Sequence, residues 1–323
     1  MACSAVLLSL AAVAAVLLAL GCAAAPTPPR EPAPEQKPLP RIGSLWNFQD
    51  PAGTEARFRE VLPAAEASGD RAYLCELTTQ IARTQGLQMK FDEALRTLDA
   101  ADAMLGEGMD RARAFCLLER GRVFNSSKRQ GDAIPLFLKA WDGARAAGLD
   151  GLAVDAAHMV AAAGTPEDSR EWNLRAIAFA EASSDPAAKA WLGSLYNNTG
   201  WDLHKAGRFE EALGLFERAL RFREESKQPA DVSVARWCLA RCLRSLGRTE
   251  EALAMQRGLL AASEATNEPD GFVHEEMAEC LLLLGKPDEA KPHFRRAWEL
   301  LSKDPWLARD EPDRLARLDR LGK

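Results

Sequence analysis

The stretch SLYNNTGWDLHKAGRFEEALGLFERALRFREES, residues 194–226, decides the fold. Its apolar residues recur every three to four positions on both sides of Gly207, which predicts two amphipathic helices joined by a tight turn. Gly200 and Ala212 have short side chains that let the two helices approach closely, and Phe216 fills the remaining space between them. This stretch is therefore predicted to form an antiparallel helix pair.

The same small residues return in register along most of the chain. Aligned on Ala212, equivalent residues follow one another at spacings of 39, 36, 43, 40 and 38. In the second helix of each pair these residues are Ala94, Ala133, Ser169, Ala212, Ala252 and Ala290, followed by Ala101, Ala140, Ala176, Ala219, Leu259 and Ala297. In the first helix they are Ala82, Gly121, Ala157, Gly200, Ala240 and Ala278. Six matches in register predict stacked helix pairs rather than an isolated motif.

This pattern resembles the tetratricopeptide repeat (TPR), and the resemblance covers roughly residues 53–303. It implies an all-α protein, a right-handed α-solenoid of about six TPR-like helix pairs with terminal capping helices. Asn47–Ser68 is expected to be a leading helix and Asp304 to begin a closing segment, because a solenoid must cover the apolar sides of its end repeats. Left-handed glycines are expected at four turns, namely Gly164, Gly207, Gly247 and Gly285.

Two departures from the common repeat are visible. Prolines stand 17 residues after three of the aligned small residues, at Pro186, Pro229 and Pro269, so the second helices are expected to run about one turn longer than usual. The third repeat, residues 151–183, is the weakest, with Asn173 where the pattern has Phe.

The N-terminal residues predict export. Ser4–Leu20 is apolar and uncharged but short for a membrane span, so it fits the apolar part of a secretion signal. The residues Ala19-Leu20-Gly21-Cys22 resemble a bacterial lipobox, in which the cysteine is acylated and becomes the mature N-terminus. We therefore expect a lipoprotein-type signal peptide over residues 1–22, ending at the lipidation site Cys22. A plain signal peptide or an uncleaved anchor is the alternative.

Residues 23–46 are expected to form a Pro-rich disordered tether, and residues 47–323 the solenoid. Seven prolines within residues 23–40 make a semi-rigid, extended spacer rather than a packed core. With an acylated Cys22, this arrangement predicts a protein anchored to the membrane of the bacterial envelope, its solenoid facing the periplasm or the outside.

Catalytic and cofactor motifs are absent from the sequence. His274 begins a pattern like that of a zinc-protease helix, but the second His one turn later is missing, so no metal site is expected. The net charge of −6, without a block of Lys or Arg, argues against nucleic acid as a partner. The five cysteines after Cys22 are expected to be small buried residues, with a Cys242–Cys280 bridge as the alternative.

The resemblance also implies where a partner binds, because first helices of the family line a concave groove. Its positions carried over to this chain are Arg83, Arg122, His158, Asn197, Trp201, His204, Lys205, Trp237, Arg241 and Arg244. Glu275 and Glu279 follow in the last repeat. Arginine pairs with carboxylates, so an acidic segment or a chain terminus is an expected ligand. The alternative is a solvated helix face in which Trp201 and Trp237 pack under the next repeat.

These observations favour a non-catalytic protein–protein interaction module, a scaffold tethered to the envelope that binds a protein or peptide segment. A regulatory sensor that changes shape when a peptide binds is the second hypothesis. An enzyme is the third, and no motif supports it.

Overall fold

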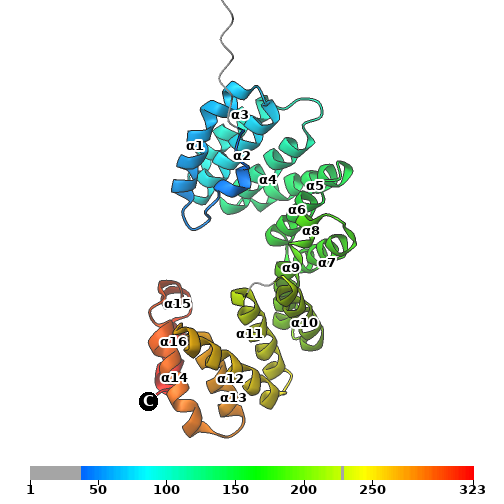
Figure 1. Cartoon of the computed structure of the whole chain (residues 1–323). Coiled ribbons are helices and arrows are strands. Elements are labelled where there is room, and N and C mark those ends of the chain that lie inside the picture. The colour runs from blue at the N-terminus through cyan, green and yellow to red at the C-terminus, as the bar shows by residue number, and fades with distance from the viewer. Residues whose placement is uncertain (1–37, 227–228) are drawn as a thin grey trace, which may run out of the picture. The chain divides into compact units, whose positions relative to one another are not determined.

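The computed structural model describes residues 38–226 and 229–323, and this part of the chain is all-α (Figure 1). Six helix pairs follow one another, and the two helices of each pair pack together. The first helices are α2 (Arg71–Leu87), α4 (Asp110–Ser126), α6 (Asp150–Ala163), α9 (Leu192–Lys205), α11 (Pro229–Ser245) and α13 (Gly271–Leu283). The second helices are α3 (Phe91–Ala103), α5 (Gln130–Ala146), α7 (Pro166–Ala182), α10 (Phe209–Glu225), α12 (Thr249–Thr266) and α14 (Pro287–Leu301). The predicted α-solenoid is confirmed.

Small residues bring the two helices of a pair together, as the pattern predicted. A Cβ added to Gly200 would lie 2.7 Å from the ring of Phe216, and one added to Gly121 would lie 2.4 Å from the ring of Phe137. Both rings are fully buried, so neither can move aside without cost. The absence of a side chain on the first helix is thus what admits a phenylalanine from the second.

The turns within the pairs follow the prediction in the last three repeats only. Gly207, Gly247 and Gly285 have φ values of 74°, 76° and 71°, in the left-handed region. Gly164 does not, and its prediction was wrong. It has extended backbone, because Thr165 caps α7 through reciprocal hydrogen bonds with Asp168 and the chain enters that helix directly.

The first two turns reach the left-handed region without glycine. Met89 has a φ of 61° and Lys128 a φ of 63°. A side chain at positive φ is unfavourable for most residues, so these turns are held by the helices on either side of them. Glycine therefore marks such a turn in this chain but is not required for it.

The second helices of the later repeats are long. α7 and α10 have 17 residues and α12 has 18, compared with 13 in α3. The third repeat is irregular, as expected. A short helix α8 (Pro186–Lys189) follows α7, and the buried Asn173 lies 3.4 Å from the hydroxyl of Ser169 and from the carboxylate of Asp202.

Additional segments cover both ends of the array. At the start, η1 (Ile42–Leu45) and α1 (Pro51–Ser68) pack on α2, with Phe58 fully buried. α1 begins at Pro51, because the Asp50 carboxylate accepts a hydrogen bond from the Gly53 amide at 2.9 Å. At the far end, α15 (Pro305–Asp310) leads to α16 (Pro312–Leu321), which packs on α14 and buries Leu318.

The packed part of the chain begins earlier than the sequence predicted. Residues 39–46 were assigned to the tether, but Leu39, Ile42, Leu45 and Trp46 pack against α1 and α2. The Tyr73 hydroxyl also donates a hydrogen bond to the carbonyl of Pro40 at 2.8 Å. The packing of Leu39 and of the apolar residues that follow it thus places the boundary near residue 39.

The predicted signal peptide, Cys22 and the tether up to residue 37 lie outside the described residues. Among the helices described, none is both long and apolar enough to cross a membrane.

Candidate partner-binding surface

The ten predicted groove residues all lie on first helices. Arg83 is on α2, Arg122 on α4, His158 on α6, and the remaining seven are on α9 and α11. Most of their side chains contact the first helix of the following repeat. The predicted face is therefore a network of contacts between repeats, and its chemistry changes along the chain.

At the N-terminal end, four charged side chains form a chain of ion pairs, here called the N-terminal ladder: Arg83, Glu119, Arg122 and Asp155. Arg83 donates to Glu119 Oε1 at 3.1 Å, and Arg122 donates to the same oxygen at 2.6 Å and to Asp155 at 2.5 Å. Glu119 is fully buried. Burial by itself lowers the pKa of Arg122, but the carboxylates of Asp155 and Glu119 raise it above its usual value.

Two aromatic rings cover the start of this ladder. Trp46 and Phe48 stack with their ring centroids 4.6 Å apart, and the Arg83 guanidinium lies over both rings at 5.6 and 5.5 Å. The Trp46 indole donates to the side chain of Gln80 at 3.1 Å. Arg83 thus has a carboxylate on one side and stacked rings on the other, an arrangement that suits the flat guanidinium.

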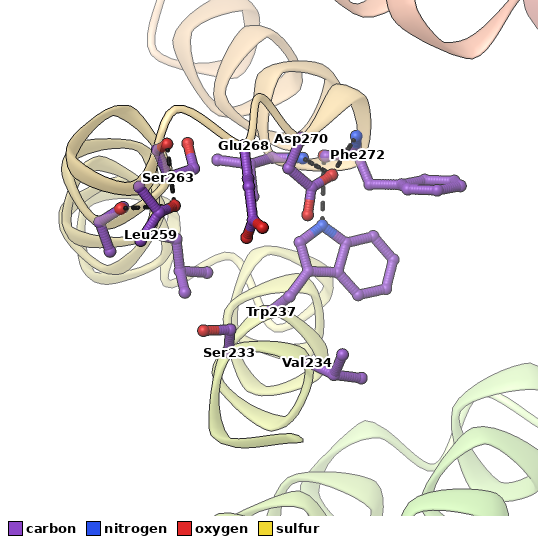
Figure 2. Close-up of a pocket in the computed structure, with 11 residues that line it drawn as sticks. Ser233, Val234, Trp237, Leu259, Ser263, Glu268, Asp270 and Phe272 are labelled. Atoms are coloured by element: carbon purple, nitrogen blue, oxygen red, sulfur yellow. Dashed lines mark hydrogen bonds between the residues drawn. The ribbon is translucent and has the colours of Figure 1, made fainter. Parts of the chain in front are cut away.

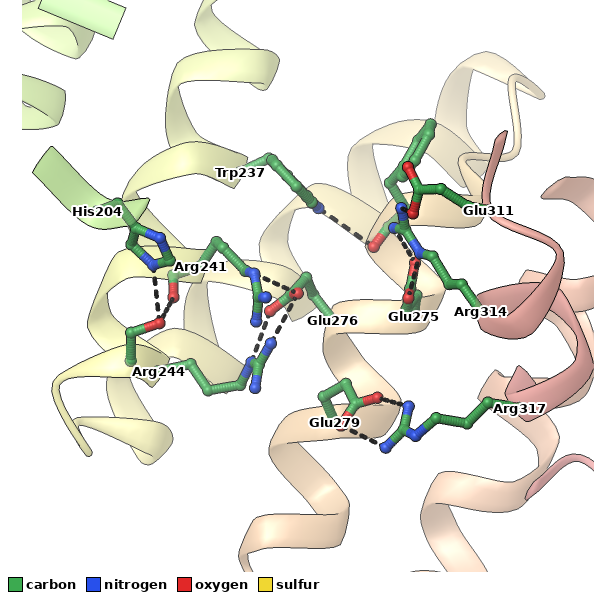
Figure 3. A network of polar contacts seen from close by, with 12 residues as sticks. His204, Trp237, Arg241, Arg244, Glu275, Glu276, Glu279, Glu311, Arg314 and Arg317 are labelled. Atoms are coloured by element: carbon green, nitrogen blue, oxygen red, sulfur yellow. Dashed lines mark hydrogen bonds and ion pairs between the residues drawn. The ribbon is translucent and has the colours of Figure 1, made fainter. Parts of the chain in front are cut away.

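A second group of ion pairs, the C-terminal ladder, consists of Arg241, Arg244 and Glu276 (Figure 3). Arg244 makes a two-pronged contact with the Glu276 carboxylate at 2.8 and 3.0 Å, and Arg241 Nε lies 3.1 Å from it. Burial raises the pKa of Glu276 to about 7, and the nearby carboxylates of Glu275 and Glu279 add to this, against the opposing effect of Arg244.

The charge pairing continues into the closing helix. Arg314 on α16 contacts both oxygens of Glu275, and Arg317 contacts Glu279 (Figure 3). These are the two acidic residues expected at groove positions of the last repeat. They hold the cap against α13.

Between the ladders, aromatic side chains replace charge. Trp201 lies 5.1 Å from Phe216 and 6.0 Å from Trp237, and Trp237 lies 6.1 Å from Phe272, all as ring centroids. We call Phe216, Trp201, Trp237 and Phe272 the aromatic row. Trp201 and Trp237 are half-buried, so each packs on the next repeat while keeping an exposed side.

The other predicted residues of this region also contact α11 or nearby rings. The His204 ring lies 2.9 Å from the Ser245 hydroxyl, and the side chain of Asn197 accepts a hydrogen bond from Cys238. His158 lies beside Trp191 with ring centroids 5.4 Å apart, and its burial lowers its pKa. Lys205 is exposed and pairs with none of the described residues.

The acidic residues that pair with the groove arginines were not predicted from the sequence. Glu119, Asp155 and Glu276 stand at one repeat position, three residues before the arginine position, and each pairs with an arginine of the preceding repeat. The aligned repeats contain this signal, since an arginine in one repeat is followed by an acid at that position in the next. Four of the arginines expected to bind an external carboxylate already have an internal one.

A pocket of about 840 Å³ opens between α11, α12 and the start of α13 (Figure 2). It is lined by Ser233, Val234, Trp237, Leu259, Ala262, Ser263, Thr266, Glu268, Asp270, Phe272 and Val273. The indole of Trp237 donates to the Phe272 carbonyl at 3.2 Å, which joins α11 to α13 along one wall. The aromatic row therefore ends at this pocket, which the sequence did not predict.

One pair of histidines lies in close contact. His274 and His293 face each other with their Nδ1 atoms 3.0 Å apart, and burial, His293 and Arg296 lower the pKa of His274 to about 4. No three His, Cys, Asp or Glu side chains in residues 38–226 and 229–323 are grouped to hold a metal ion.

The five described cysteines are buried and free, so the alternative Cys242–Cys280 bridge is absent. Cys75 and Cys116 form the closest pair, with their sulfur atoms 4.0 Å apart in the interface between α2 and α4. Burial raises the pKa of Cys242 to about 11 and that of Cys280 to about 12. The prediction of small buried residues is confirmed.

Comparison with known families identifies tetratricopeptide repeats in two segments. Models of this repeat match residues 192–226 and 233–255, which include α9 and α10 and much of α11. The first match coincides with the stretch that decided the fold from sequence. No curated protein matches the chain in sequence.

Several solved structures are similar in fold. They include the apo form of RapI (TM-score 0.69, 14% identity, 86% of this chain and 78% of that one). A Signal Transduction ATPase with Numerous Domains from Pyrococcus horikoshii, which carries a tetratricopeptide repeat sensor, gives a TM-score of 0.65 at 15% identity. BtubC from P. vanneervenii gives 0.54 at 15% identity, covering 72% of this chain and 94% of that one. The match to the ATPase spans 84% of this chain but only 43% of the ATPase.

Proposed function

We propose that this protein is a non-catalytic interaction module whose first helices bind a protein or peptide segment between α9 and α13. The observation that carries the proposal is the aromatic row, half-exposed and continuous from Trp201 to Phe272, which ends at the 840 Å³ pocket. Exposed aromatic side chains next to a hollow are typical of surfaces that bind partners. Tetratricopeptide repeats in the same helices support this assignment.

The two ladders support this function as a frame. Each links first helices of adjacent repeats through carboxylate residues that are at most 7% exposed, so the spacing between repeats is fixed by more than apolar packing. A surface that is fixed before binding loses less conformational entropy when a partner arrives. In this proposal the ladders hold in place the first helices that carry the aromatic row, and they do not bind the ligand themselves.

A carboxylate-bearing ligand, with a sensor function, is the second candidate. Arg241 and Arg244 are held by Glu276, whose pKa is raised to about 7. A carboxylate from a partner, assisted by the exposed Lys205, could replace Glu276 when that side chain takes up a proton. Such an exchange would free α13 from α11 and change the shape of the array, so a ligand-dependent change in small-angle scattering distinguishes a sensor from a fixed scaffold.

We propose further that residues 1–22 are a signal peptide, that Cys22 is acylated, and that the Pro-rich residues 23–38 tether the repeats to the membrane of a bacterial envelope. The lipobox-like residues before Cys22 and the prolines support this. Expression in a bacterium fed an alkyne-labelled fatty acid tests it. Labelling of the wild-type protein and none of a Cys22→Ala variant is expected, and equal labelling would refute the anchor.

The binding function is tested by selecting peptides from a random displayed library with the purified full chain. Peptides that bind the wild-type protein should bind Trp237→Ala at least about tenfold more weakly, since buried aromatic side chains dominate such interfaces. Trp306→Ala is the matched control, because Trp306 is 67% exposed on α15 and lies outside the aromatic row. Failure to select any peptide, or equal loss in both variants, would reject the proposed surface.

A further inference from the structure

We propose that the pocket between α11, α12 and α13 binds a bulky apolar side chain of a partner peptide, with a lysine or arginine next to it in the peptide. The inference rests on the proposed function and specifies the chemistry of the ligand. It differs from the acidic ligand that the groove arginines suggested from sequence.

Leu259 on α12 lines the hollow, and Gly271 directly precedes the lining residues Phe272 and Val273 on α13. Leu259 stands where the other five repeats have alanine, so a larger side chain is buried at this position. On α13 the glycine allows close packing, because a Cβ at Gly271 would lie 2.7 Å from the side chain of Leu301. The first turn of α13 therefore packs closely on α14, and the pocket lies on the side that faces α11 and α12.

The walls of the pocket are mainly apolar and are accessible. Val234 is 56% exposed and Phe272 is 36% exposed, and Trp237 lies between them (Figure 2). Burying one large apolar side chain here removes its surface from water and anchors a short peptide segment. The volume lies within the range of about 300–1,000 Å³ that is usual for ligand sites.

The charged residues that line the pocket are all acidic. Glu268 points into it between α12 and Trp237 (Figure 2), and its carboxylate pairs with none of the described residues. The Asp270 carboxylate accepts hydrogen bonds from the Phe272 and Val273 amides through one oxygen. Of the described residues that line the pocket, none is basic. A cation beside the apolar side chain of the peptide would therefore be attracted here, and a carboxylate would be repelled.

The guanidinium that lies over Phe272 does not change this balance. Arg314 lies over the Phe272 ring at 5.5 Å, but it is paired with Glu275 and Glu311. The arginines of the C-terminal ladder are likewise bound to Glu276. Of the two carboxylates at this pocket, Glu268 is thus the one that a partner can reach without breaking an existing ion pair or hydrogen bond.

The experiment uses fluorescein-labelled nonapeptides with a central Leu, Phe or Trp that is flanked by Lys, by Ser or by Glu. Their affinities for the purified full chain are measured by fluorescence anisotropy at low and high salt. Lys-flanked peptides should bind at least about fivefold more tightly than the Glu-flanked ones, and salt should reduce the difference.

Two variants with matched controls locate the binding. Ala262→Phe fills the pocket from α12 and should weaken binding at least about tenfold. Ala261→Phe places the same ring on the adjacent exposed position, outside the pocket lining, and should not. Glu268→Gln should reduce the preference for Lys-flanked peptides about two- to fivefold. Glu250→Gln, at an exposed position near the start of α12, should leave it unchanged.

The outcomes separate this inference from the proposed function. Binding of library-selected peptides that Trp237→Ala weakens but Ala262→Phe does not would leave the interaction module standing and overturn the pocket. Peptides that bind in the pocket with a preference for flanking Glu would overturn the assigned charge. If no peptide binds in either assay, the proposed function fails together with the pocket.

Discussion

The N-terminal and C-terminal ladders join neighbouring repeats by the same kind of ion pairing, but their surroundings differ. In each, one buried carboxylate is shared by two arginines, and each thereby joins neighbouring repeats. Glu119 uses a single oxygen for both arginines, and its other oxygen has no partner among the described residues. Glu276 uses both oxygens, with Arg244 in two-pronged contact.

The larger difference is what lies beside each ladder. Trp46 and Phe48 stack over Arg83 and cover the N-terminal ladder. The C-terminal ladder instead lies next to the aromatic row and the open pocket. Similar ion pairs thus complete a closed face at one end and support an open one at the other. The comparison teaches that access to each ladder depends on what covers the arginines rather than on the arginines themselves.

The largest effect is expected when the shared carboxylate of the N-terminal ladder is removed. Glu119→Ala leaves Arg83 and Arg122 without this partner in a buried site, which should lower the free energy of unfolding by about 3–5 kcal/mol. Denaturant unfolding followed by circular dichroism measures it. Glu60→Ala, an exposed residue on α1, is the control. A loss below about 1 kcal/mol would show that the ladder does not hold these repeats together.

The C-terminal ladder is distinguished by its response to pH. The pKa of Glu276 is raised to about 7 in the folded protein, from an ordinary value of 4.5. Between these values the folded state binds the extra proton, so the contribution of Glu276 to stability is present at low pH and is lost as pH rises toward 7. The difference in unfolding free energy between wild type and Glu276→Gln should therefore fall across pH 4.5–7, by at most about 3 kcal/mol.

The unfolding free energies of wild type and Glu276→Gln must be subtracted, because other groups titrate in the same pH range. The lowered pKa of His274 gives a slope of opposite sign, but it is common to both proteins and cancels. Arg241, Arg244, Glu275 and Glu279 remain unchanged in the variant. A difference that rises with pH would mean that the arginines, rather than burial, dominate the titration of Glu276.

The fold was largely predictable because close helix packing requires small residues at fixed spacing. Gly121, Gly200 and their equivalents mark where the two helices of a pair approach closely. This requirement involves residues of one helix pair only, so it is visible in the local sequence. The turn at Gly164 was mispredicted because capping by Thr165 and Asp168 offers another way to leave a helix. The left-handed Met89 and Lys128 were missed because their residue types do not reveal the conformation that their surroundings impose.

The candidate surface was predictable in position but not in chemistry. Helical periodicity places Arg83, Trp201 and Arg241 on one face, but it does not show that the next repeat supplies Glu119 or Glu276. The pocket could not be predicted from the sequence, because its lining comes from three helices whose relative placement the repeat pattern does not specify. Contacts between repeats, rather than within them, account for what was missed.

A smaller effect is expected from overpacking the helix pair that lies between the ladders. Gly200→Leu forces a side chain against the buried ring of Phe216 and should cost about 1–3 kcal/mol. Gly214→Leu on α10 is the matched control, since a Cβ there meets nothing within 4 Å. Hydrogen exchange should show faster opening in α9 and α10, with both ladders less affected, because repeats are coupled mainly to their neighbours. Unchanged exchange in α9 would refute the repeat register.

The smallest effect tests the covering rings directly. Arg83→Lys keeps the charge facing Glu119 but loses the flat contact with Trp46 and Phe48, so it should cost about 0.5–1 kcal/mol. Arg241→Lys keeps the charge facing Glu276 where none of the described aromatic rings lies over the guanidinium, so its cost should be smaller. Denaturant unfolding of both variants gives the comparison. Equal losses would mean that the rings add nothing to the ion pair, and the distinction between a covered and an open ladder would have to rest on the pocket alone.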